Sequence, residues 1–403
     1  MLATASDHAR ALEIASAQPM LAQVERWCAV PSGSDDAEGL ATMAGLLADA
    51  FARLPGDLRL VDPAPVERIA ADGGAIPVPT GRSLHLRVRP QAPVQLLLTG
   101  HMDTVYGPGN DFRSLAWRDD GMLNGPGVAD MKSGIAIILA ALTALETSSL
   151  AARIGYEVVI NGDEETGSLG SSALIARAAR GKIAALTYEP STLPDGTLAG
   201  ARPGSGNFAI VIEGRAAHAG RNPEDGRNAI VAAADLALRL AKAAGPRLSV
   251  NPARIDGGGP NNVVPDRAVL RVNMRPATPE DQARAQSLLD GAVAMIGAEH
   301  DVRLHVHGGF ARPPKPLDAG AERLFGLVRA CGHELGQEIG WQPTGGVCDG
   351  NNIAACGVPV VDTMGARGGA IHSRDEYLVV DSLPERAMLS TLVLLRFAER
   401  GRP

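Results

Sequence analysis

Acidic and imidazole side chains recur along this chain just after its apolar runs, where strands give way to loops. The set consists of His101, Asp103, Asp130, Glu164, Glu165, Glu189 and His372. Oxygen and imidazole ligands at strand ends can build an open metal site that binds water, and no cysteine belongs to the set. The pattern therefore indicates a catalytic two-metal hydrolase site rather than a closed structural zinc site.

His101 and Asp103 follow the apolar run VQLLLT, and Asp130 lies just before a helical stretch. A carboxylate such as Asp103 commonly fixes the tautomer of a metal-bound imidazole such as His101. Taken alone, a strand-end histidine and a turn aspartate are the simpler explanation. Asp130, in GPGVADMKSG, could cap the following helix or bridge two cations through its two oxygens.

Three consecutive acids, Asp163-Glu164-Glu165, end another apolar run, and no basic residue lies within several positions. A bound cation would relieve their repulsion, although a solvated acidic turn explains the segment equally well. Two adjacent glutamates allow a division of labour, with one binding metal and one accepting a proton from water. Glu189 and His372 are each weak indications when taken alone.

Short apolar runs alternate with helical spacing over most of the chain, which favours an α/β layer. Runs bounded by Pro and Gly are typical of strands buried on both faces of a sheet. We therefore predict a mixed, mostly parallel sheet flanked by helices. The predicted strands are 94–99, 154–160, 184–188 and 358–362, and the predicted helices lie within 11–54 and over 133–146, 171–179 and 319–335.

The stretch 203–312 has a different order of predicted strands and helices. It contains the strand-like FAIVIEG, a helix over 227–244, a strand over 268–274, a helix starting at Thr278-Pro279, and the alternating DVRLHVH. This β-α-β-β-α-β order predicts a ferredoxin-like α+β module inserted into a larger domain. We therefore divide the chain into an α/β domain, 1–202 and 313–403, and the α+β module, 203–312.

Composition limits the partners. A chain of 403 residues exceeds what one core usually serves. A net charge of −7 disfavours nucleic-acid binding, and no apolar run is long enough to cross a membrane. The N-terminus lacks the basic start and apolar core of a secretory signal. The cysteines show no CxxC spacing, which favours reduced thiols and a cytoplasmic location: Cys28, Cys331, Cys348 and Cys356.

Taken together, the strings GHMDTV, NGPGVADMKSG, NGDEETGSLGS, YEP and AIHS resemble the zinc-dependent aminoacylase and carboxypeptidase family of metallopeptidases, family M20. The likeness spans essentially the whole chain and is greatest to the glutamate carboxypeptidase branch. It implies two zinc ions per chain, with cobalt or manganese as alternatives, and a cis peptide bond after the bridging aspartate. The roles it implies are His101 and Glu189 on one zinc, Glu165 and His372 on the other, Asp130 bridging, Glu164 as general base, and Asp103 orienting the first histidine.

The resemblance also implies that the α+β module is a lid and dimerisation domain. His218 would reach the partner's active site and stabilise the oxyanion, while Asn262 and Arg275 would hold the substrate carboxylate. Without the resemblance, a surface histidine and a salt-bridge arginine are the simpler explanations. Gly345 and Gly346 resemble the backbone loop that faces the substrate. Glutamate carboxypeptidases often present a lysine near the start of the lid, where Arg202 stands here, so the side-chain preference stays open.

The sequence thus predicts a cytoplasmic, homodimeric di-zinc hydrolase that cleaves the amide bond of N-acyl amino acids or small peptides with a free C-terminal carboxylate. A deacylase of the acetylornithine or succinyl-diaminopimelate type would share every metal ligand. A catalytically silent zinc-binding dimer is disfavoured by the presence of Glu164. A nicotinamide oxidoreductase is disfavoured because no predicted strand runs into GxGxxG.

Overall fold

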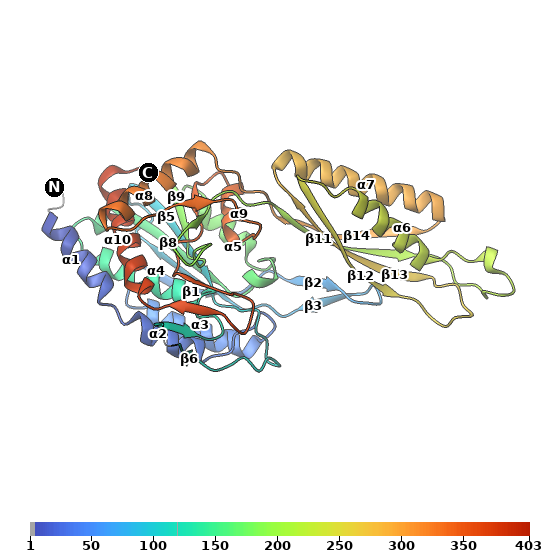
Figure 1. The fold of residues 1–403 in the computed structure, drawn as a ribbon, viewed down its shortest axis with the longest axis horizontal. Coiled ribbons are helices and arrows are strands. Elements are labelled where there is room, and N and C mark those ends of the chain that lie inside the picture. The colour runs from blue at the N-terminus through green and yellow to red at the C-terminus, as the bar shows by residue number, and fades with distance from the viewer. Residues whose placement is uncertain (1–4, 119) are drawn as a thin grey trace.

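The computed structural model describes residues 5–118 and 120–403, which form an α/β unit and an α+β module (Figure 1). The α/β unit is built on a six-stranded sheet in which three neighbouring pairs are parallel and two, at one edge, are antiparallel. The predicted mixed, mostly parallel sheet is confirmed. In sheet order the strands are β1 (Asp57–Val61), β4 (Ser83–Val88), β8 (Ile154–Asn161), β5 (Val94–His101), β9 (Ala184–Thr187) and β16 (Val360–Val361).

Helices cover both faces of this sheet, which explains why its central strands are apolar at nearly every position. Along β5, Leu96 and Leu98 join the main core, whereas Leu97 joins a second core on the other face. Helices of the main core are α1 (Ala5–Ser16), α2 (Met20–Cys28), α3 (Ala37–Phe51), α4 (Lys132–Glu146), α8 (Ala319–Glu334) and α10 (Ser382–Arg400). The second core is closed by α5 (Ser172–Ala179) and α9 (Asp349–Ala355).

Short strands form three smaller sheets within the described part of the α/β unit, one of which is the β2 (Val66–Ile69)–β3 (Ala75–Val78) hairpin. The other two carry loops that the sequence did not predict as ordered, including the one that holds His372 between two strands. The first sheet has the order β17 (Gly368–Gly369), β18 (Tyr377–Val379), β7 (Met122–Asn124) and β6 (Ala116–Trp117), and the second pairs β10 (Leu198–Ala199) with β15 (Trp341–Gln342).

The α+β module has the β-α-β-β-α-β order that the sequence predicts. Its antiparallel sheet runs β12-β13-β11-β14, and Thr278 is the N-cap of α7, where its hydroxyl accepts the Asp281 N–H. A core of its own includes Ile210, Leu236 and Leu289. The elements are β11 (Ser205–Glu213), α6 (Ala229–Lys242), β12 (Leu248–Gly257), β13 (Arg267–Pro276), α7 (Pro279–His300) and β14 (Arg303–Arg312).

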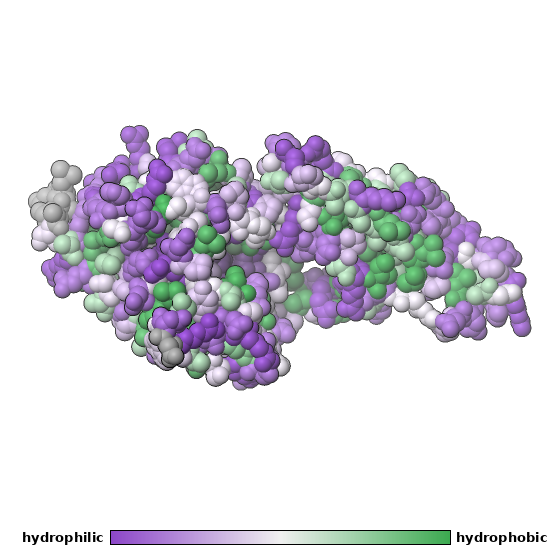
Figure 2. Space-filling view, in the orientation of Figure 1, coloured by the Kyte–Doolittle hydropathy of each residue, from purple (hydrophilic) through white to green (hydrophobic). Residues whose placement is uncertain are grey.

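Large hydrophobic side chains remain exposed on the helical face of the module. Val231 and Leu238 lie seven positions apart on α6, and Met295 lies on α7. Figure 2 shows hydrophobic atoms gathered over this part of the module. An exposed apolar patch of this kind is typical of a surface that another protein covers.

A hairpin from the α/β unit reaches the opposite face of the module sheet. Its strands are β2 (Val66–Ile69) and β3 (Ala75–Val78), and Figure 1 shows them extending toward β12 and β13. Ile69 packs against Val211 and Val269 of the module. Sequence reasoning did not predict this contact. Among the described residues, no helix is both long and apolar enough to cross a membrane.

Candidate active site

The strands of the α/β unit bring the predicted acidic and imidazole residues to one edge of the sheet. β5 ends at His101, β8 ends shortly before Glu164 and Glu165, and β9 ends two residues before Glu189. These strands are parallel, so their carboxyl ends lie side by side and form the usual position of a site in an α/β sheet. Asp130 reaches the same place from the segment before α4.

Asp130 lies between two groups of possible ligands. His101 Nε2 is 3.2 Å from Asp130 Oδ1 and 3.5 Å from Glu189 Oε2. His372 Nε2 is 3.3 Å from Asp130 Oδ2 and 3.2 Å from Glu165 Oε2. Each carboxylate oxygen of Asp130 thus faces a different imidazole. The alternative role of helix cap is wrong, because the N-cap of α4 is the next residue and Asp130 caps nothing there.

Asp103 holds several parts of the site in place. Nδ1 of His101 is 3.0 Å from the Asp103 carbonyl oxygen and 3.4 Å from its Oδ1. The Asp103 carboxylate also accepts the backbone N–H groups of Glu164 and Glu165, each at 3.1 Å, and the Ser34 hydroxyl at 2.7 Å. With Nδ1 facing these oxygens, Nε2 of His101 is free to act as a ligand.

The cluster carries more negative charge than its own cations balance. Burial raises the pKa of Glu164 to about 8, and the charge of Arg312 opposes this only in part. Burial also raises the pKa of Glu189 to about 8 and that of Glu165 to about 7. Hydrogen bonds to two carboxylates raise the pKa of His372 to about 10. Divalent cations would stabilise the ionised carboxylates.

The donor set fits such cations. Ligand atoms of His101, Glu164 and Glu189 lie within 4.8 Å of one another, as do those of His101, Asp130 and Glu165. Oxygen and imidazole donors without a thiolate suit zinc in an open, water-binding site. His372 adds a more exposed donor, because half of its side-chain surface is accessible.

The backbone that presents these ligands is unusual at two points. The peptide bond between Asp130 and Met131 is cis, as the family resemblance implies. Ala370 and His372 both have φ values in the left-handed region, 50° and 61°, which side chains other than glycine rarely adopt. Such residues cost about 1–3 kcal/mol each and are found mainly at functional sites.

Glu376 fixes the segment that carries the bridging aspartate, and sequence reasoning missed it. Its Oε1 accepts the backbone N–H groups of Ala129 at 3.0 Å and Asp130 at 3.1 Å. Its Oε2 accepts the Tyr106 hydroxyl at 2.8 Å. The carboxylate therefore joins the His372 loop to the Asp130 segment. Its position four residues after His372 was the one signal available in the sequence.

A cavity of about 420 Å³ opens over the cluster. Acidic and imidazole groups form one part of its wall, and small polar residues such as Ser191, Thr192 and Thr344 form another. Its size is in the range of sites for small organic ligands.

Arg202 lines this cavity, but its guanidinium already has partners. Nε and Nη2 bind the two oxygens of Asp362 at 2.8 and 3.2 Å, and Nη1 donates to the Gly346 carbonyl at 3.1 Å. Arg202 thus makes a bidentate carboxylate interaction within the chain, with Asp362. Arg202 is only 8% exposed.

The residues predicted in the α+β module fall into two groups. Arg275, at the inner end of β13, donates from Nη1 to the Gly345 carbonyl at 2.9 Å, next to Gly346 in the cavity wall. His218 and Asn262 lie beyond the outer end of the sheet, because β11 starts at the connection to the α/β unit and ends before them (Figure 1). The structure therefore does not bring these two residues to the cavity of their own chain.

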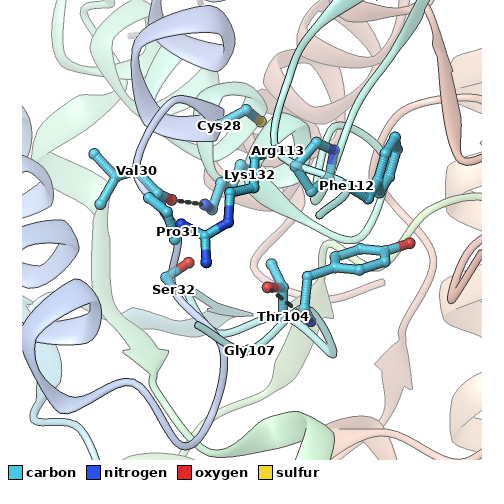
Figure 3. A pocket seen from close by; sticks show the side chains of 11 residues that line it. Cys28, Val30, Pro31, Ser32, Thr104, Gly107, Phe112, Arg113 and Lys132 are labelled. Carbon is cyan, nitrogen blue, oxygen red and sulfur yellow. Dashed lines mark hydrogen bonds between the residues drawn. The ribbon is translucent and has the colours of Figure 1, made fainter. Parts of the chain in front are cut away.

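A second, much smaller cavity lies beside the start of α4 and holds a buried lysine. Figure 3 shows Lys132 hydrogen-bonded to the Val30 carbonyl, at 2.9 Å, and Nζ also donates to the Trp27 carbonyl at 3.1 Å. Burial lowers the pKa of Lys132. The cavity volume of about 10 Å³ excludes a substrate. Lys132 therefore connects the end of α2 to the helix behind Asp130.

Comparisons with known proteins agree with this geometry. A family model described as "Peptidase family M20/M25/M40" matches residues 97–396. Carboxypeptidase G2 from Pseudomonas sp. (strain RS-16) is 30% identical over 379 residues, covering 92% of this chain and 88% of that protein. A succinyl-diaminopimelate desuccinylase from Psychrobacter arcticus is 27% identical over 325 residues, covering 74% of this chain and 77% of that protein.

Solved structures share the fold. The YXEP protein of Bacillus subtilis, described as a dinuclear metal-binding peptidase of the M20 family, superposes with a TM-score of 0.64. The alignment covers 98% of this chain and 99% of that chain at 15% sequence identity. At that identity the likeness concerns the arrangement of helices and strands.

Proposed function

We propose a substrate class and a mechanism on one premise, namely that this chain belongs to peptidase family M20/M25/M40. It is a metal-dependent peptidase or amidohydrolase. Our proposal is that it cleaves the amide bond of N-acyl amino acids or small peptides with a free C-terminal carboxylate, as a glutamate carboxypeptidase does. The observation that carries the two-metal mechanism is the position of Asp130, whose two oxygens face two separate imidazoles. The substrate class is supported by the 30% identity to carboxypeptidase G2.

We assign the ligands from the distances between donor atoms. His101 and Glu189 form one set, and His372 and Glu165 form the other, with Asp130 shared between them. We call these five residues the ligand cluster. We propose two zinc ions per chain, with cobalt or manganese as alternatives. Zinc ions held there would lower the pKa of a shared water to about 7 and polarise the scissile carbonyl.

In the proposed mechanism, Glu164 is the general base. It accepts a proton from the attacking water and returns it to the leaving amine, which requires a carboxylate that is not itself committed to a metal. Asp103 orients His101 and holds the backbone of Glu164. Arg275, with the backbone at Gly345 and Gly346, would bind the substrate carboxylate, a role supported by its hydrogen bond to the Gly345 carbonyl beside the cavity.

We further propose that the α+β module, 203–312, is the lid and dimerisation domain of a homodimer. His218 and Asn262 lie at its outer end, so they would serve the partner's cavity, where His218 donates to the oxyanion. β11 is hydrogen-bonded on both sides and has no free edge for pairing with a second chain. We therefore assign the dimer interface to the adjoining helix α6 rather than to β11, because Val231 and Leu238 are exposed on α6.

Other functions remain to be separated from this one. The acetylornithine- or succinyl-diaminopimelate-type deacylase is supported by the 27% identity to a desuccinylase. A catalytically silent zinc-binding dimer would have no use for a base at Glu164. A cytoplasmic location, favoured by the cysteine pattern, stays a prediction.

The test is a substrate panel with metal-reconstituted protein. It contains N-acyl glutamate and N-acyl aspartate, dipeptides, acetylornithine and succinyl-diaminopimelate, and release of the free amine is measured. We expect the largest kcat/KM for an N-acyl amino acid with a free carboxylate. Hydrolysis confined to acetylornithine or succinyl-diaminopimelate would establish the deacylase instead. Stoichiometric metal binding without turnover of any compound would support the silent dimer.

A further inference from the structure

The two connections between the α/β unit and the α+β module run side by side. Arg202 and Lys315 exchange backbone hydrogen bonds, each of 2.9 Å, in an antiparallel bridge. Their side chains meet on one buried carboxylate, since Arg202 Nε is 2.8 Å and Lys315 Nζ 3.0 Å from Oδ2 of Asp362. Both connections are therefore anchored at the same point of the α/β unit.

The start of α9 holds the same two connections from another side. Asn351 Nδ2 donates to the carbonyl oxygens of Pro203, at 2.9 Å, and Pro313, at 2.8 Å. Asn352 Nδ2 donates to the Ala311 carbonyl at 2.9 Å. The module thus joins the α/β unit through a fixed set of hydrogen bonds rather than a loose linker.

Arg312 is the last residue of β14, and its side chain extends from this junction to Glu164. Nη2 lies 2.7 Å from Glu164 Oε1 and 2.9 Å from the Glu164 carbonyl oxygen. Nη1 lies 2.9 Å from Asp349 Oδ1 and 3.1 Å from Asn352 Oδ1. The guanidinium is 4% exposed. A planar, buried guanidinium with several acceptors holds each of them in a narrow range of positions.

The neighbouring glutamate has different surroundings. Glu165 directs Oε2 to His372, at 3.2 Å, on the ligand side of the cluster. Glu164 is instead held through both its side chain and its backbone by Arg312. The ion pair between Arg312 and Asp349 also stabilises the fold, since breaking a buried pair leaves an uncompensated charge. A stabilising role alone, however, does not require contact with Oε1 of the base.

We propose that Arg312 is a positioning residue that, from the end of a module strand, sets the orientation of the Glu164 carboxylate toward the attacking water. This inference rests on the role of Glu164 as general base. It makes the geometry of the base depend on how the module is seated on the α/β unit, because Arg312 belongs to the strand that enters the junction.

The experiment is a double-mutant cycle on the metal-loaded full-length protein, with a substrate that the wild type hydrolyses. Arg312→Ala should lower kcat by about 10-fold to 10²-fold, as expected for a misplaced catalytic group, and leave KM and metal content close to wild type. In a Glu164→Gln background, Arg312→Ala should cause little further loss of kcat, because the group it positions is gone. Added guanidinium ion should restore part of the kcat of Arg312→Ala.

Arg386→Ala is the matched control. Arg386 is also fully buried and donates to a backbone carbonyl, that of Gly196, but it has no contact with the cluster. This variant should lose stability, show no rescue of kcat by guanidinium, and combine additively with Glu164→Gln. If Arg312→Ala fails to fold, Arg312→Lys takes its place. The charge is kept and the planar fork is lost, so kcat should still fall with the same non-additivity.

Two outcomes would overturn the inference while leaving the proposed function intact. The first is a kinetic outcome: either kcat stays at the wild-type value in Arg312→Lys and Arg312→Ala, or the loss of kcat is fully additive with that of Glu164→Gln. The other is a crystal structure of metal-loaded Arg312→Lys in which the Glu164 carboxylate has not moved. A wild-type protein that hydrolyses no compound of the substrate panel would instead refute the proposed function, and the crystal structure would still test the position of Glu164.

Discussion

The sheet edge of the α/β unit and the outer end of the α+β module are assembled in different ways. At the sheet edge, one chain brings its donor atoms within about 3.2–3.5 Å of one another, and most of them are buried. At the outer end, His218 is exposed, and its Nδ1 accepts the N–H groups of Gly220 and Arg221 in the same turn. The donor atoms of the ligand cluster thus all come from one chain, whereas His218 would need a second surface to take the role proposed for it.

The difference shows what each region can do alone. The ligand cluster is fixed by strand ends and by buried carboxylates such as Asp103 and Glu376, so metal binding should not depend on the oligomeric state. Oxyanion stabilisation by His218 should depend on it. Metal content and turnover are therefore separable quantities, and the predictions below separate them.

The largest effect is expected from breaking the ligand cluster itself. Glu165→Gln removes a charged donor beside His372, so the protein should lose metal and with it measurable turnover. Elemental analysis of protein purified without chelator checks this, together with activity before and after addition of zinc or cobalt. A Glu165→Gln protein with full metal content would show that this carboxylate is not a ligand.

The next effect separates the base from the ligands in the same region. Glu164→Gln keeps the size of the side chain and its contact with Arg312 but cannot accept a proton. Turnover should fall by about 10²-fold to 10⁴-fold, whereas metal content should match that of the wild type. Metal content and kcat, measured in both Glu164→Gln and Glu165→Gln, test whether Glu164 is the base and Glu165 a ligand. Equal metal loss in Glu164→Gln and Glu165→Gln would contradict it.

The sequence predicted the strands that build this edge because their signal is local. The run 94–99 became β5, Val94–His101, and 154–160 became β8, Ile154–Asn161, since continuous apolar segments bounded by turn residues define buried strands. β12, with the sequence LSVNPARIDG, was not located. It is a largely exposed edge strand that contains a proline, which weakens any strand pattern.

Residues that act through distant contacts left no comparable signal. Arg312 lies 148 positions from Glu164, and Glu376 lies 246 positions from Asp130. No local pattern connects such pairs, so they become visible only when the chain is folded. The sequence also left Asp130 open between helix cap and bridging ligand, and the geometry around it excludes the helix cap.

A smaller effect is expected at the outer end of the module. His218→Ala should lower turnover by about 10²-fold to 10³-fold, the usual loss for one oxyanion donor, and leave metal content unchanged. Mixing this variant with Glu164→Gln under subunit exchange should restore activity, because one site in each heterodimer combines an intact base with an intact His218. Exchange shown by mass spectrometry without recovered activity would place the action of His218 outside the partner's cavity.

The smallest effect is expected from a change in the proposed dimer interface. This surface would bring the outer end of one module to the sheet edge of the partner chain. Leu238 on α6 is 62% exposed, and covering it in a dimer would contribute roughly 1.5–3 kcal/mol. Leu238→Asp should therefore weaken dimerisation by at least about 10-fold in Kd, measured by sedimentation at several concentrations. Turnover at low protein concentration should fall in parallel, while metal content stays constant, because the ligand cluster belongs to one chain.

The control is Val306→Asp on β14. This exposed position lies at the edge of the module sheet opposite the β12 side, which α6 covers. A Leu238→Asp protein that stays dimeric, or a monomer that keeps full turnover, would show that α6 is not the interface on which His218 depends.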